Sequence, residues 1–166
     1  MENERIEKAN IICMDKVRNI IKRKPLLFFI TSAAYITAVS LFKWGIHPTL
    51  DTAWFMIGGF IGIYFLDVAE DFFALHSSPF RSVLFMGAYA IVSFFITTSS
   101  SIALARGLVL SLYLQLLLWQ VGEWRLTGSD ASWYKLVADA VPKRTQEWLL
   151  FGFIVLFIIE TYLFIR

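Results

Sequence analysis

Long apolar blocks separated by short polar segments make up the sequence from residue 26 onward. Each block is close to the roughly 20 residues that an α-helix needs to cross a bilayer core of about 30 Å. The stretch from Ser82 to Gln120 is nearly two spans long, so we place a tight helical turn near Thr97 to Ser101. The predicted transmembrane helices are Leu26 to Trp44, Thr52 to Leu75, Pro79 to Ile96, Ile102 to Trp124 and Gln146 to Ile165.

The first 24 residues have a different pattern, in which apolar side chains recur every three or four positions and polar side chains fill the other face. This periodicity predicts an amphipathic helix at the membrane surface. Lys22, Arg23 and Lys24 form a basic collar before the first span, where they can contact anionic lipid headgroups. A cytosolic partner helix is the alternative occupant of the apolar face.

A second amphipathic segment lies between the fourth and fifth spans, at about residues 129–141. Ser129 or Asp130 can cap it, Trp133 belongs to its apolar face, and Pro142 ends it. We expect a short interfacial helix there. Residues 25–166 then form one all-α, five-helix transmembrane domain, and the chain is a polytopic membrane protein.

Composition agrees with this fold class. The chain is 58% hydrophobic with a mean hydropathy of +0.65, whereas soluble domains are nearer 45–50% apolar. The net charge is only +2, and no basic groove with interleaved aromatics is visible, so we expect no nucleic-acid partner. One cysteine excludes an intramolecular disulfide and a Cys-based metal site.

The distribution of Lys and Arg predicts the orientation. Twelve of them fall on the side that includes the N-terminus and the second and fourth loops, which places the N-terminus inside and the C-terminus outside. The expected location is a bacterial inner membrane with a cytoplasmic N-terminus, or an organelle membrane. Interfacial tryptophans support this map, and we expect them to be Trp44, Trp54, Trp119, Trp124, Trp133 and Trp148.

Carboxylates near the inner end of the second span are the main functional signal. Asp67, Glu70 and Asp71 share one helix face, and Asp67 lies about 22 Å along the span at 1.5 Å per residue. Gln120 and Glu123 end the fourth span at the same level. Together they predict a polar inner cluster.

Three interpretations of this cluster stay open. Interfacial carboxylates can pair with Arg81, Arg125 or Lys24. Clustered carboxylates can also bind a cation or a proton. Third, Asp67 and Asp71 can share a hard metal ion, and their D-x-x-x-D spacing is similar to that of intramembrane prenyl- and phosphatidyl-transferases, although the longer signatures are absent.

Two further features concern helix packing. Arg106 and Glu160 occur at a similar outer depth, so we predict an ion pair between the last two spans, with outward snorkelling of Arg106 as the alternative. Gly58 and Gly62 form a G-x-x-x-G motif typical of close helix packing.

These features favour a non-enzymatic membrane component. It would act as a subunit of a larger assembly, a homo-oligomer, or an oligomeric ion or proton channel or transporter. The alternative is a small metal-dependent enzyme that acts on a phospholipid or prenyl diphosphate through Asp67, Glu70, Asp71 and Glu123. No catalytic residue, resident metal or other cofactor is assigned.

Overall fold

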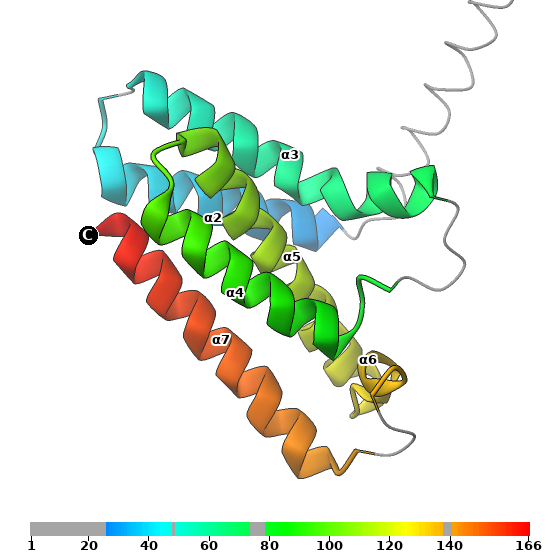
Figure 1. Cartoon of the computed structure of the whole chain (residues 1–166). Helices are drawn as coiled ribbons and strands as arrows, with labels where there is room; N and C mark the ends of the chain where they lie inside the picture. Colours follow the sequence, from blue (N-terminus) through cyan, green and yellow to red (C-terminus); the bar gives the residue numbers. More distant parts are fainter. Residues whose placement is uncertain (1–25, 48, 74–78, 138–140) are drawn as a thin grey trace, which may run out of the picture.

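The computed structural model describes residues 26–47, 49–73, 79–137 and 141–166 (Figure 1). These residues are helical with no strand, which confirms the all-α prediction for the described part of the chain. The predicted N-terminal amphipathic helix, including Lys22, Arg23 and Lys24, lies outside the described residues.

Each predicted span has a corresponding helix. Among the described helices, four are long and apolar enough to cross a membrane, and α4, with 17 residues, is a shorter apolar helix. The described helices are α2 Leu26–Trp44, α3 Leu50–Phe72, α4 Val83–Ser99, α5 Ala103–Thr127, α6 Ala131–Tyr134 and α7 Lys143–Ile165.

Caps explain several of the differences between the observed and the predicted helix bounds. α3 starts at Leu50, two residues before the predicted start, because Thr49 and Thr52 form a capping box. α4 starts at Val83 rather than Pro79, because the Ser82 hydroxyl accepts a hydrogen bond from the Phe85 amide at 3.2 Å. Gly128 ends α5 in the left-handed region, with φ of 66°.

Helix α5 is the centre of the bundle, in contact with α2, α3, α4 and α7 (Figure 1). Its side chains at Leu110, Tyr113 and Leu116 are fully buried. The closest approach is to α3, where a Cβ on Gly58 would stand 2.0 Å from the Leu104 carbonyl oxygen, and one on Gly62 would stand 2.6 Å from that of Leu108. Small residues therefore allow the two backbones to touch.

The two ends of the bundle differ in composition. At the end where α5 begins, the rings of Trp44, Phe55 and Phe164 pack together, with the Phe55 and Phe164 centroids 5.0 Å apart. At the other end α5 terminates beside α6 and the first turn of α7, and we call this region the α6 end.

Helix α6 is much shorter than the segment of about 129–141 that the pattern predicts, since only Ala131–Tyr134 is helical and a turn follows. Residues 138–140 lie outside the described part. The Asp130 side chain makes no capping hydrogen bond to this helix. Burial of Trp133 and Tyr134 holds the segment in place instead.

Candidate functional site

The acidic end of α3 is tied to the start of α4 by an ion pair. Arg81 donates from Nε to Glu70 Oε1 at 3.1 Å and from a terminal nitrogen to Glu70 Oε2 at 2.9 Å. Such two-point contacts are geometrically specific as well as charge-assisted. Glu70 thus has the basic partner that the interfacial interpretation requires.

The same guanidinium lies over the indole of Trp119 in α5, 4.1 Å from the ring centroid. This distance is well within the range of a cation–π contact. Because Trp119 also packs edge-on against Phe28 of α2, one chain of contacts connects α2, α5, Arg81 and the end of α3.

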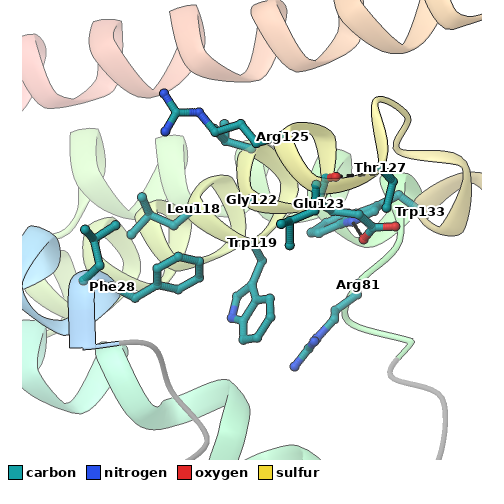
Figure 2. A pocket seen from close by; sticks show the side chains of 12 residues that line it. Phe28, Arg81, Leu118, Trp119, Gly122, Glu123, Arg125, Thr127 and Trp133 are labelled. Carbon is teal, nitrogen blue, oxygen red and sulfur yellow. Dashed lines mark hydrogen bonds between the residues drawn. The ribbon is translucent and has the colours of Figure 1, made fainter.

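These contacts border a largely apolar cavity of about 500 Å³ at the α6 end (Figure 2). Figure 2 shows Arg81 and Trp119 close together and the Arg125 side chain pointing away from them. The lining residues are Leu27, Phe28, Arg81, Leu118, Trp119, Val121, Gly122, Glu123, Arg125, Leu126, Thr127 and Trp133.

The members of the predicted inner cluster differ in their partners and in their burial. Glu123 is directed to α6, where Ser132 donates to Oε1 and the Trp133 indole donates to Oε2 at 3.0 Å. Gln120 is fully buried, whereas Asp67 and Asp71 are half-buried on α3. Across the residues that the structure describes, no group of three or more His, Cys, Asp or Glu side chains is placed to hold a metal ion.

Sequence reasoning did not find the network that fixes the loop after α5. Gln146 in the first turn of α7 accepts from the Asp130 amide at 2.8 Å and from the Ser129 hydroxyl at 3.1 Å. Its own amide donates to the Val141 carbonyl at 2.8 Å. The amphipathic pattern of the loop does not indicate that the loop bonds to a glutamine of the next helix.

Asp130 is fully buried in this loop. Burial and the nearby Glu123 carboxylate raise the pKa of Asp130 to about 6, while the Gln120 amide partly offsets the rise. Burial and the Asp130 charge raise the pKa of Tyr134 to about 12. The Tyr134 phenol is therefore neutral at pH 7.

A second polar site lies between α4 and α7. Glu160 is 1% exposed, and its Oε1 accepts hydrogen bonds from Ser93 at 2.5 Å and Thr97 at 2.7 Å. Ser93 and Thr97 are four residues apart and so lie on the face of α4 that meets α7.

The structure does not bring Glu160 and Arg106 together as an ion pair. Arg106 extends over the Phe164 ring, with 5.7 Å between the guanidinium carbon and the centroid. Phe164 is one helical turn beyond Glu160 on α7, toward the end of the bundle. This position of Arg106 agrees with the alternative of outward snorkelling, in which a long side chain carries its charge toward the polar boundary of the membrane.

Two more polar contacts join α2 to its neighbours, one buried and one partly buried. The Gln115 amide of α5 donates to the Ser32 hydroxyl at 2.5 Å, and the Tyr35 and Thr161 hydroxyls lie 2.8 Å apart. Sequence reasoning missed these pairs because a hydroxyl in an apolar helix is compatible with both lipid and protein surroundings.

The tryptophans fall into two environments. Trp54 and Trp148 are exposed, as anchors in lipid would be, while Trp44, Trp119 and Trp124 are partly buried. Trp133 is 1% exposed and hydrogen-bonded to Glu123. The indole N–H of Trp133 therefore donates to a protein acceptor, as buried indoles usually do.

The part of the chain that the structure describes is therefore all-helical, and four of its helices are long and apolar enough to cross a membrane. No model of a known protein family matches the chain, and neither curated proteins nor solved structures include a significant match.

Proposed function

We propose that this protein is a non-enzymatic multi-pass membrane component that acts by assembling with other membrane proteins or with copies of itself. The supporting observation is the use of polar side chains inside the bundle. The buried Glu160 bonds to Ser93 and Thr97, the buried Gln115 bonds to Ser32, and the partly buried Tyr35 bonds to Thr161, and each contact joins one helix to another. Such contacts fix the register of helices in lipid.

The outward surface of α3 also supports this proposal. Phe60, Ile61, Phe65 and Val68 are exposed there and line, with Tyr64, a shallow apolar hollow of about 390 Å³. A surface of aromatic and branched side chains gives a broad area for contact with another apolar helix. The experiment that tests assembly is the polypeptide mass of the particle extracted in a mild detergent, which the proposal expects to exceed one 19.1 kDa chain.

The proposed topology has five crossings with the N-terminus inside. Cys13 is the only cysteine and can be labelled as the N-terminal probe, while Arg166→Cys in a Cys13→Ser chain is the C-terminal probe. In sealed inside-out vesicles, a membrane-impermeant maleimide should label Cys13 and leave the introduced C-terminal cysteine unlabelled. Labelling of both sites would mean an even number of crossings, in which case the short helix α4 does not span.

A channel formed by several copies is one version of this function. Flux of protons and monovalent cations into liposomes is compared between the wild-type chain and Asp67→Asn. An unchanged flux removes the Asp67 carboxylate from such a pathway.

The cavity at the α6 end favours a second candidate, an enzyme acting on a phospholipid or prenyl diphosphate. Its wall is mostly apolar, and two arginines, Arg81 and Arg125, are among its lining residues. Guanidinium groups are suited to phosphate recognition. This candidate requires divalent-dependent turnover that is lost in Asp67→Ala or Asp71→Ala, and turnover retained in both variants would exclude it.

A further inference from the structure

The Glu160 carboxyl group lies inside the helix bundle, about 8 Å along α7 from the end of that helix at Ile165. Only 1% of the residue is exposed. Its donors in the described part of the chain are the neutral hydroxyls of Ser93, at 2.5 Å, and Thr97, at 2.7 Å, and both donate to the same oxygen, Oε1. An ionised carboxylate in this place would lose its hydration and receive no positive charge from these donors.

The basic side chains at this end of the bundle are directed elsewhere. Arg106 of α5 and Lys43 of α2 both lie over the ring of Phe164, at 5.7 Å and 5.5 Å from the centroid. Phe164 is one helical turn beyond Glu160, toward the end of α7. Among the residues that the structure describes, no ion pair involves Glu160. The carboxyl group therefore has no cation in direct contact.

Aromatic rings border Glu160 on the side away from Phe164. Phe157 is three residues earlier on α7 and so shares the face of Glu160, and its ring lies 5.2 Å from that of Tyr35 and 5.2 Å from that of Tyr113. Tyr89 of α4 extends this cluster, 6.1 Å from Tyr113. The three phenol hydroxyls bond to the Thr161 hydroxyl, the Phe153 carbonyl and the Val109 carbonyl. These titratable neighbours on α2, α4 and α5 thus direct their hydroxyls to other acceptors.

The end of α4 also disfavours a negative charge on Glu160. Helix α4 ends at Ser99, so Thr97 belongs to its last turn. The C-terminal turn of a helix carries a partial negative charge, which opposes an anion placed beside it. Because Thr97 bonds directly to the Glu160 carboxyl group, that group lies next to the negative end of α4.

We propose that Glu160 is a proton-binding site and that its carboxyl group holds the proton at neutral pH. The proton belongs on Oε2, because Oε1 already accepts both hydroxyl donors. In this state α7 is joined to α4 through hydrogen bonds and without a buried charge. Loss of the proton would place a negative charge between the two helices, so their contact depends on protonation. Such a site is a property of a single chain and stands whether or not the chain assembles with others.

The test is the infrared spectrum of the full-length protein in detergent at pH 7, recorded for the wild type and for Glu160→Gln. A protonated carboxylic acid has a C=O stretching band that an ionised carboxylate lacks. The wild-type spectrum minus the Glu160→Gln spectrum should contain this acid band and no carboxylate bands. Glu147→Gln, at an exposed position of the same helix, is the matched control, and its difference spectrum should contain carboxylate bands alone.

Thr97→Val and Ser93→Ala keep the carboxyl group and so test the site even if Glu160→Gln does not fold. Each removes one donor from Oε1, and the acid band should move to higher frequency because a C=O bond stiffens when it loses a hydrogen bond. Thr98→Val is the control, since the Thr98 hydroxyl bonds to the Phe94 carbonyl of its own helix, and should leave the band in place. Carboxylate bands in the Glu160→Gln difference spectrum overturn the proposal. An acid band that neither Thr97→Val nor Ser93→Ala shifts also overturns it.

Discussion

Gly58 of α3 and Leu104 of α5 meet through their backbones: a Cβ at position 58 would stand 2.0 Å from the Leu104 carbonyl oxygen. Gly107 of α5 shows the same close approach, because a Cβ at position 107 would stand 2.1 Å from the Phe55 carbonyl oxygen of α3. No side chain can be added at either position unless the two helices separate.

Gly58→Ala should therefore destabilise the protein by about 2 kcal/mol or more, because overpacking moves backbones as well as side chains. The readout is the free energy of unfolding in mixed detergent. Gly87→Ala in α4 and Gly152→Ala in α7 are the matched controls, since nothing lies within 4 Å of a Cβ at either position.

The controls should be neutral or slightly stabilising, because alanine is favoured over glycine inside a helix by roughly 0.5–1 kcal/mol. A Gly58→Ala protein as stable as the Gly87→Ala protein would mean that α3 and α5 are further apart than described.

The ion pair of Glu70 and Arg81 should appear as an energetic coupling. Both side chains are partly exposed, at 19% and 34%, so the expected coupling in a Glu70→Gln and Arg81→Gln cycle is only about 0.5–1 kcal/mol. It should weaken in high salt. The same cycle with Asp71→Asn in place of Glu70→Gln is the control, and a coupling of equal size there would contradict a specific pair.

Glu160 should couple to α4 and not to Arg106. Ser93→Ala and Thr97→Val each remove a donor from a buried carboxylate, which should cost about 1–3 kcal/mol. Glu160→Gln keeps an acceptor oxygen and should be milder. In the Arg106→Ala and Glu160→Ala cycle the two effects should add, and a large coupling there would support a direct ion pair.

Helix positions could be predicted because crossing a bilayer demands length and apolarity, both of which a single sequence displays. The predicted and observed ends of α2 coincide at Trp44, which Gly45 follows with a positive φ of 72°. The observed starts of α3 and α4 differ from the predicted starts because the hydroxyl side chains of Thr49 and Ser82 cap these helices.

The partners of the polar side chains could not be predicted in the same way. Helical periodicity says which residues share a face but not which helix that face meets. Glu160 and Arg106 carry opposite charges at a similar predicted depth. The residues that donate hydrogen bonds to the Glu160 carboxylate, however, are Ser93 and Thr97. Gln146 similarly bonds to a loop that the pattern had treated as an independent interfacial helix.

Stability should depend on pH through Asp130. Its pKa is about 6 in the folded protein against an ordinary value of 3.8, so the folded state binds more protons between these pH values. The contribution of Asp130 to stability should therefore be fully present below about pH 4 and fall by roughly 2 kcal/mol as the pH rises to 7.

Asp130→Asn should flatten this profile, whereas Glu147→Gln should leave it unchanged. The measurement is the free energy of unfolding from pH 4 to 7 in N-methyl-D-glucamine buffers. A wild-type profile with the same pH dependence as that of Asp130→Asn would contradict the burial of the Asp130 carboxyl group.

The central claim, that the chain works as part of a membrane assembly, is tested most directly by the polypeptide mass of the particle extracted from its own membrane. Light scattering combined with size-exclusion chromatography in a mild detergent separates protein mass from detergent mass. We expect a protein mass of at least two chains, or of one chain with a fixed partner. A uniform particle containing a single 19.1 kDa chain would contradict it.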